Sequence, residues 1–496
     1  MDRNKRNFVI AMVALMMVSM VILSGCQAPT SKAEQTTEKE VYGGENKDSN
    51  GEASKEEQGA QGVEEKNIVY ISASKLNVRQ EAINNAAVVE SFMKGTAVEV
   101  VEEKTNENNE LWYKISFDTK EGKSTGWIVS TYTVKDRLEL LDKSLRILDF
   151  SPQNKVKEYE GNPSVNVKGI YVTEHSFIGE GFERLLKLAN ETEINAFVID
   201  VKDDDGIMLF PNEAAEKYSP EGNKRARANM EKLKERMQIL KDNNIYTIAR
   251  IVTFKDPMYT KQHPDRAILD KRTGTTFISK DKLRWASPHD RELWNYDIAV
   301  AKEAARVGFN EIQFDYVRFP ASNGNKLDQA LDYRNTHGDQ SKPQTIQHFL
   351  QQAHDELSKE GVYISADVFG LVGSVTDDMG LGQYWEAISN VVDYISPMMY
   401  PSHYANGTYG LSIPDAHPYE LVYQGTKDAI ARNQNIPTPA NIRPWIQDFT
   451  ASWVKGYIKY GPKQVKDQIK ALEENGVESY LLWNAGNKYS QGALVE

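Results

Sequence analysis

Two strand-like segments of this sequence each carry one aspartate close to the point where the strand ends. The first, residues 311–320, reads EIQFDYVRFP and contains Asp315 before a proline, which ends a strand because it has no N–H to donate. The second, residues 362–370, reads VYISADVFG and contains Asp367. A buried ionisable group is costly unless it is paired or used. Two carboxylates at neighbouring strand ends are the groups that cleavage of a glycosidic bond requires.

Eight strand-like runs follow residue 165, and segments with helical periodicity lie between them. The runs are 168–173, 196–202, 246–254, 311–320, 362–370, 393–401, 442–449 and 479–486, and the main helical segments are 182–191, 230–243, 291–307, 345–359, 419–433 and 462–475. This alternation implies a parallel sheet with right-handed crossovers. The pattern predicts an α/β fold with a (β/α)8 TIM barrel over residues 165–496. The alternative is an open doubly wound sheet, but the first run is followed by no GxGxxG phosphate loop.

The C-terminal ends of barrel strands are where catalytic and binding groups gather. In this sequence those ends are rich in acids, bases, amides and aromatic rings. Aromatic faces stack on sugar rings, and carboxylates and amides bind hydroxyl groups, so the set suits a carbohydrate. The candidate substrate-binding residues are Asp200, Lys202, Arg250, Arg318, Tyr400, Trp445, Asp448, Trp483 and Asn484.

A structural role is the alternative reading for several of these side chains. Asp315 can pair with Arg250 or Arg318 instead of acting on a substrate. Asp200 and Lys202 are two residues apart, which places them on one face of their strand, so they can form an internal ion pair.

Metal and serine chemistry are both disfavoured by the sequence. The eight histidines form no HxH or HExxH pattern, and no GxSxG elbow is present. The run Asp203-Asp204-Asp205-Gly206 is more typical of a solvated turn than of a calcium loop, because consecutive side chains diverge. We therefore expect neither a metal nor a cofactor.

The N-terminal residues have the layout of an export signal. A basic start is followed by an apolar run over 8–23 and then by Leu23-Ser24-Gly25-Cys26. Small residues before a lone cysteine resemble the bacterial lipoprotein lipobox, which implies that residues 1–26 are a signal peptide and lipobox and that Cys26 carries the lipid. The alternative is a plain transmembrane anchor. Residues 27–66 are poor in large apolar side chains and predict a disordered linker.

A small all-β segment follows over residues 67–135, with strand-like runs at 68–72, 97–102, 112–117 and 126–129. The elements LNVR (76–79), Gly95-Thr96, WYKI (112–115) and GWI (126–128) together resemble the bacterial SH3-like (SH3b) family. That resemblance implies a small β-barrel that binds a cell-wall ligand, and a rigid spacer is the alternative. Residues 136–164 predict a helical connector.

Four motifs in the barrel segment resemble one known family. They are KGIYVT (168–173), VIDVKDDDG (198–206), QFDYVRFP (313–320) and SPMMYP (396–401). The family is the glycosyl hydrolase-type domain family catalogued as domain of unknown function 4015, and the likeness spans about residues 166–490. It implies a TIM-barrel fold of the α-amylase type and a hydrolase of polysaccharide.

An α-amylase-type site would use Asp315 as nucleophile, the residue at Asp367 as general acid and Asp448 as a supporting acid. The family type has Glu where this chain has Asp367, and Asp448 can equally be a helix cap. We expect Asp315 and Asp367 to be the catalytic pair.

Taken together, these features predict a glycoside hydrolase that is lipid-anchored on the extracellular face of the bacterial cell membrane. Its partners would be a polysaccharide substrate, a possible cell-wall ligand of the SH3-like domain and the membrane. The formal net charge of −12 argues against nucleic acid. The alternative function is a catalytically inactive glycan-binding lipoprotein of the cell envelope.

Overall fold

The computed structural model describes residues 67–119, 122–141, 145–321, 326–339 and 341–495. The described residues form two compact units, one ending at Leu141 and one following it. The predicted signal segment, Cys26 and the linker over 27–66 lie outside the described residues. Within the described ranges, no helix has both the length and the apolar character needed to cross a membrane.

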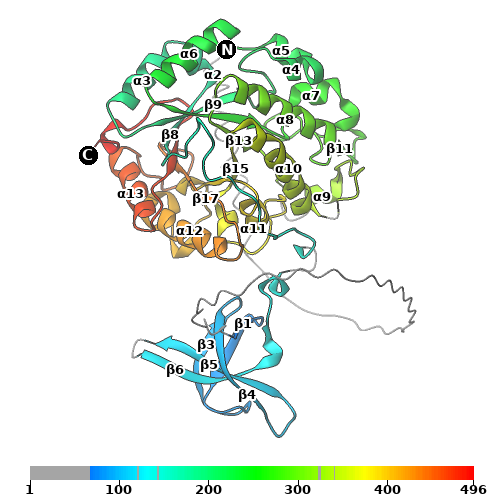
Figure 1. The fold of residues 1–496 in the computed structure, drawn as a ribbon, viewed down its shortest axis with the longest axis vertical. Helices are drawn as coiled ribbons and strands as arrows, with labels where there is room; N and C mark the ends of the chain where they lie inside the picture. Colours follow the sequence, from blue (N-terminus) through cyan, green and yellow to red (C-terminus); the bar gives the residue numbers. More distant parts are fainter. Residues whose placement is uncertain (1–66, 120–121, 142–144, 322–325, 340, 496) are drawn as a thin grey trace, which may run out of the picture. The chain divides into compact units, whose positions relative to one another are not determined.

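The first unit is an antiparallel sheet with the strand order β3-β2-β6-β5-β4-β1-β7 (Figure 1). The strands are β1 (Ile68–Ile71), β2 (Lys75–Arg79), β3 (Val88–Met93), β4 (Ala97–Thr105), β5 (Leu111–Thr119), β6 (Gly122–Val129) and β7 (Thr133–Val134). Alternate apolar side chains such as Val69, Val78 and Ile128 are fully buried, as a period of two requires. Trp112 is buried, whereas Trp127 is partly exposed, with Lys114 over its ring.

The second unit is a closed barrel of eight parallel strands, so the predicted fold class is confirmed. The strands are β8 (Lys168–Val172), β9 (Ala196–Lys202), β10 (Tyr246–Val252), β13 (Glu311–Asp315), β15 (Tyr363–Phe369), β16 (Tyr394–Met398), the pair β17 (Asn441–Ile442) and β18 (Trp445–Gln447), and β19 (Tyr480–Trp483). Each strand pairs in parallel with the next, and β19 pairs with β8 to close the ring. The seventh strand is broken because Pro444 offers no N–H between its two parts.

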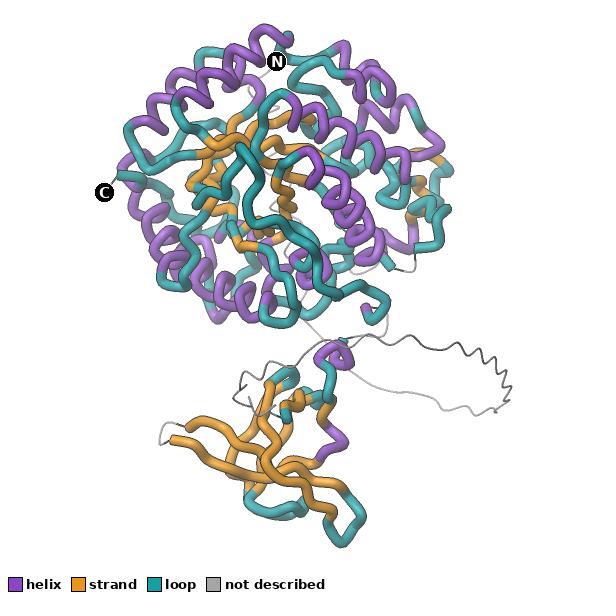
Figure 2. Tube along the Cα trace, viewed as in Figure 1, coloured by secondary structure: helices purple, strands orange, loops and turns teal. Residues whose placement is uncertain are grey.

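Helices surround the barrel strands (Figures 1 and 2). The longer ones are α3 (Gly181–Asn190), α6 (Met230–Asp242), α8 (Arg291–Arg306), α10 (Lys342–Leu357), α12 (Pro418–Asn433) and α13 (Pro462–Glu473), within about three residues of the predicted bounds. Shorter helices are α2 (Glu174–Ile178), α4 (Glu213–Tyr218), α5 (Pro220–Lys224), α7 (Pro257–Gln262), α9 (Lys326–Ala330) and α11 (Trp385–Ser389). A small antiparallel sheet of β11 (Leu269–Asp270), β12 (Thr275–Thr276) and β14 (Leu331–Asp332) lies in the loops after β10 and β13.

Apolar side chains fill two separate layers. One lies between strands and helices and includes Ile312 and Phe314; the other lies inside the barrel and includes Ile248 and Trp445. An ion pair between Arg443 and Glu311 is also enclosed, with both side chains fully buried. The interior is therefore packed rather than open, and chemistry is confined to the strand ends.

The prediction of a helical connector is wrong for the described part of residues 136–164. The described residues there form no α-helix: 3-10 geometry is found at Arg137–Leu140 and at Leu145, and the chain from 149 onward is mostly extended, with Pro152 and Pro163 opposing a helix. The later part of this segment lies against the N-terminal end of the barrel, where the Tyr363 hydroxyl of β15 donates to the Lys157 carbonyl. Asn162 donates to the carbonyls of Asn310 and Gly361, which lie just before β13 and β15.

Candidate active site

The register of two neighbouring strands brings Asp315 and Asp367 together. Phe314 of β13 pairs in parallel with Ala366 of β15, and both contact the outer layer, so the next residues on the two strands point into the barrel. Adjacent strands lie about 4.8 Å apart. Asp315 is 7% exposed and Asp367 is 2% exposed. The two carboxyl groups therefore lie side by side at the C-terminal end of the barrel interior.

Asp315 is held by an arginine and by its own backbone. Arg250 of β10 donates to Asp315 Oδ2 from Nε at 2.9 Å and from Nη2 at 2.5 Å. The N–H of Tyr316 donates to Asp315 Oδ1 at 2.6 Å. Tyr316 has φ +52°, a conformation that costs free energy for a residue other than glycine and that concentrates at functional sites. The pairing with Arg250 that the sequence offered as an alternative is present.

Asp367 has a different environment. The indole Nε1–H of Trp445 donates to Asp367 Oδ1 at 2.7 Å. Burial, and then the negative charge of Asp315, raise the pKa of Asp367 well above its usual range, although the bond from Trp445 acts in the opposite direction. The raised pKa favours the protonated form of Asp367, while its neighbour Asp315 is paired with a cation. Unequal environments of this kind distinguish an acid from a nucleophile.

Arg250 also links the pair to other acids at the same end of the barrel. Its Nη1 donates to Asp200 Oδ1 at 2.6 Å, and its Nη2 lies 3.4 Å from Asp204. Asp200 in turn accepts from the hydroxyl of Tyr171 at 2.5 Å, and burial raises the pKa of Asp200 to about 6. Asp204 and Tyr171 were not among the candidate substrate-binding residues from the sequence, although both stand at strand ends.

Aromatic rings line the side opposite to β13. Trp483 stacks on Tyr171 with ring centroids 4.1 Å apart, and Trp445 and Tyr400 contact Trp483 at 5.5 and 6.4 Å. Trp483 is partly exposed and Tyr400 and Trp445 are buried. Trp483 can therefore offer a ring face to a sugar, whereas Trp445, 1% exposed, is placed to hold Asp367.

Lys202 is not at this site, and the predicted phase with Asp200 is wrong. A register shift in β9 pairs Asp200 with Arg250 but Lys202 with Ile251, so one residue is extra and Lys202 turns to the outer face. There its Nζ contacts Asp256 at 3.0 Å and Asp297 at 2.5 Å, with all three side chains fully buried. The suggested ion pair of Asp200 with Lys202 is absent for the same reason.

Asp448 and Asn484 are occupied in the C-terminal segment. Asp448 accepts from the N–H and the hydroxyl of Ser490, both at 2.7 Å. The Asn484 side chain donates to the carbonyls of Asp448 and Lys488. These bonds shape the turn after β19, and neither side chain joins the Asp315–Asp367 pair.

Two cations stand on the β10 and β13 side of the pair. Lys255, which sequence reasoning missed, contacts Asp204 at 3.0 Å and Asp281 at 2.9 Å. Arg318 lies among the rings of Trp285, Tyr316 and Phe369. Lys255 directly follows the predicted strand run 246–254, and this position was the signal that could have identified it.

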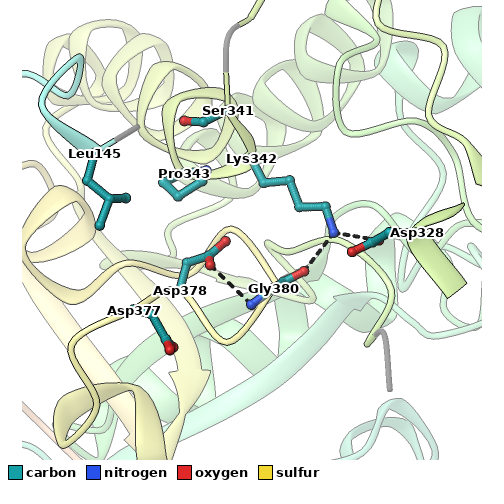
Figure 3. Close-up of a pocket in the computed structure, with 8 residues that line it drawn as sticks. All are labelled: Leu145, Asp328, Ser341, Lys342, Pro343, Asp377, Asp378 and Gly380. Carbon is teal, nitrogen blue, oxygen red and sulfur yellow. Dashed lines mark hydrogen bonds and ion pairs between the residues drawn. The ribbon is translucent and has the colours of Figure 1, made fainter. Parts of the chain in front are cut away.

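Two surface hollows, of about 410 and 340 Å³, lie around the start of α10. Figure 3 shows Lys342 in the larger one, with Nζ donating to Asp328 and to the Gly380 carbonyl, both at 2.7 Å. The N–H of Gly380 donates to Asp378 at 3.1 Å. None of the residues around Asp315 and Asp367 lines either hollow, and these polar groups satisfy one another. Among the described residues, no group of three or more His, Cys, Asp or Glu side chains is arranged to hold a metal ion.

Two family models match parts of the chain. Residues 169–489 match the family described as "Putative glycosyl hydrolase domain", domain of unknown function 4015. The chain belongs to this family. Residues 74–134 match the bacterial SH3 domain, so an SH3 domain precedes the glycosyl hydrolase domain. No curated protein matches the chain.

Several solved structures are similar to parts of the chain. A hypothetical protein from Ruminiclostridium thermocellum is 31% identical, with 43% of this chain and 98% of that chain covered and a TM-score of 0.34. The PgaB (BpsB) glycoside hydrolase domain from Bordetella bronchiseptica is 10% identical, with 67% and 99% covered and a TM-score of 0.45. The spore cortex-lytic enzyme SleL of Bacillus cereus is 12% identical, with 67% and 74% covered and a TM-score of 0.40.

Proposed function

We propose that the glycosyl hydrolase domain cleaves glycosidic bonds in an extracellular or cell-wall polysaccharide by a paired-carboxylate mechanism. The observation that carries this proposal is the asymmetry of the pair. Asp367 is buried with a raised pKa beside Asp315, which is ion-paired with Arg250. The raised pKa suits Asp367 to donate a proton, and the ion pair suits Asp315 to donate an electron pair, which are the two roles that glycoside hydrolysis needs.

In the first step, Asp367 gives its proton to the glycosidic oxygen as the bond from that oxygen to the anomeric carbon breaks. Asp315 supplies an electron pair to the anomeric carbon and forms a glycosyl ester. In the second step, the Asp367 carboxylate takes a proton from water. The oxygen of that water attacks the anomeric carbon, and the bond from this carbon to the Asp315 oxygen breaks. Asp315 is then a free carboxylate again, and Asp367 carries the proton taken from water.

The neighbouring side chains position this pair. Arg250 fixes the Asp315 carboxylate through two N–H bonds to one oxygen. Trp445 fixes one oxygen of Asp367 and so directs the proton to the other. Trp483, stacked on Tyr171 and partly exposed, would stack on a sugar ring beside the cleaved bond.

We further propose that the protein is exported and anchored through a lipid on Cys26, at the extracellular face of the cell membrane, and that the SH3 domain binds a cell-wall ligand. The support is the lipobox-like run before Cys26 and the match to the bacterial SH3 domain. Labelling cells with a radioactive or clickable fatty acid tests the anchor. The wild-type chain should incorporate label and Cys26→Ser should not; equal labelling would overturn the anchor.

The catalytic proposal is tested by incubating the protein with purified cell-wall and capsular polysaccharides and analysing the products by mass spectrometry. The wild-type protein should release oligosaccharides with new reducing ends, and Asp367→Asn should release them about 10²–10⁴ times more slowly. A protein that binds a polysaccharide and never shortens it would be a glycan-binding lipoprotein instead.

A further inference from the structure

The cations around the Asp315–Asp367 pair fall into two groups. Three of them have carboxylate partners within 4 Å: Arg250 with Asp200, Asp204 and Asp315, Lys255 with Asp204 and Asp281, and Arg227 with Asp203 and Glu174. Arg318 differs. Its Nη1 donates to the Phe319 carbonyl at 3.0 Å, and no carboxylate among the described residues lies within ion-pair distance of it.

Arg318 is also surrounded by rings. Its guanidinium carbon lies 4.9 Å from the ring centre of Trp285, 5.1 Å from Tyr316 and 4.8 Å from Phe369. We call these three residues the aromatic box. Rings can cover the faces of a guanidinium group, but they leave its edge N–H groups without acceptors. Arg318 is partly buried, and this burial lowers its pKa, whereas the paired Arg250 has a raised pKa.

An unpaired cation in such a place is costly to folding unless it is used. The aromatic box cannot repay the whole cost, because its rings cover only the faces of the guanidinium, and the one hydrogen bond that Arg318 makes to the described chain is to the Phe319 carbonyl. The other groups that could neutralise Arg318 are already engaged: Asp204 and Asp281 pair with Lys255, and Asp315 pairs with Arg250. The missing partner is therefore an anion that the described chain does not supply.

The position of Arg318 indicates where that anion would come from. Arg318 follows Asp315 by three residues, and Phe369 of the aromatic box follows Asp367 by two. Tyr316 adjoins both groups: its ring centre lies 5.1 Å from the Arg318 guanidinium carbon, and its N–H donates to Asp315. A substituent on a sugar bound at the carboxylate pair would reach the free edge of the guanidinium.

We infer that Arg318 binds a carboxylate carried by the glycan, so that the substrate is an acidic polysaccharide. The guanidinium edge presents parallel N–H groups whose spacing matches the two oxygens of a carboxylate. A neutral hydroxyl would accept one bond but would leave the positive charge unbalanced. This inference rests on the proposed function, because it assumes that a glycan occupies the Asp315–Asp367 site.

The experiment measures binding of the full-length protein to a uronic acid-containing polysaccharide by affinity electrophoresis. The same polymer, with its carboxyl groups reduced to alcohols, is the matched neutral probe. The wild-type protein should bind the native polymer about tenfold or more tightly than the reduced one, as a charged bidentate bond implies. Arg318→Gln should bind both polymers alike, and Arg318→Lys should recover part of the preference. Arg272→Gln, which changes an exposed arginine paired with Asp270, is the control and should keep the preference.

Equal binding of native and reduced polymer by the wild-type protein, or no binding of either, would overturn the inference. Stronger binding of a glycerol phosphate polymer than of the uronic acid polymer would also overturn it, because the anion would then be a phosphate. The readout does not depend on turnover. A preference for the acidic polymer that Arg318→Gln abolishes, in a protein that cleaves no polymer, would support the inference and contradict the proposed hydrolase.

Discussion

Asp315 and Asp367 occupy the next register position after the parallel pair of Phe314 with Ala366, so two inward-facing carboxyl groups stand on adjacent strands at the same height. Their partners make them unequal. Asp315 accepts N–H groups from Arg250, and Asp367 accepts one indole N–H from Trp445. The arrangement places an acid with a raised pKa, Asp367, beside a carboxylate that is ion-paired with Arg250.

Trp445→Phe should shift the pH dependence of turnover. The indole N–H stabilises the ionised form of Asp367, so its loss should raise the pKa of Asp367 further. An acid that must be protonated sets the alkaline limb of kcat/KM, and this limb should move to higher pH while kcat falls about 10-fold or more. Initial rates measured from pH 4 to pH 10 check this. A lower rate with an unmoved alkaline limb would mean that Trp445 only packs.

Asp367→Asn should change stability in a pH-dependent way. The folded pKa of Asp367 is raised, so its contribution to stability is fully present below the unfolded pKa of about 3.9 and is lost as pH rises through the folded pKa. Asparagine does not titrate, so its contribution to stability does not fall as pH rises, and its side-chain oxygen can still accept the N–H of Trp445. The melting temperature of the variant, relative to wild type, should therefore rise between pH 4 and pH 8. A difference that stays constant over this range would show that the pKa of Asp367 is not raised.

Retention of configuration is the expected stereochemical outcome. Adjacent strands lie about 4.8 Å apart, and the two aspartates have equal side-chain length. This spacing is closer to the distance of about 5–5.5 Å between the carboxyl groups of retaining enzymes than to about 6.5–9.5 Å in inverting ones. Proton NMR of the first anomer released gives the answer. An inverted first product would assign Asp315 to the activation of water.

Lys155→Met should destabilise the barrel although it lies far from the site. The Nζ of Lys155 donates to the carbonyls of Ser389, Val392 and Thr438 at 2.9, 2.5 and 2.7 Å. Methionine would leave these acceptors without their charged donor, at a cost of about 1–3 kcal/mol. Urea unfolding of the variant should show a lower midpoint. Lys157→Met, at an exposed neighbouring side chain, is the control and should leave the midpoint within experimental error.

The alternation of strand and helix was enough to predict the barrel, because hydrophobic periodicity is a local property. It was also enough to place Asp315 and Asp367 at strand ends. It could not predict the bulge in β9, which turns Lys202 to the outer face, because nothing local distinguishes a bulged strand from a regular one. Nor could it predict which donors Asp448 would meet, because Ser490 is 42 residues away in the chain.

For residues 136–164, local sequence propensity predicted a helix that does not form in the described part. Part of the segment instead makes its hydrogen bonds with the barrel, as Asn162 does with the carbonyls of Asn310 and Gly361. Tertiary contacts of this kind override local propensity. Tyr171 and Lys255 were overlooked for a related reason. Their part in the site depends on Asp200 and Asp204, which other strand ends supply.

The most direct test of the central claim compares the turnover of Asp315→Asn with its melting temperature and its glycan binding. Arg250 keeps Asp200 and Asp204 as partners in this variant, so the cation is not left unpaired. We predict a protein that melts within a few degrees of wild type, still binds the polysaccharide and cleaves it at least about 10³-fold more slowly. Cleavage at a rate within tenfold of wild type by a folded Asp315→Asn protein would contradict the account.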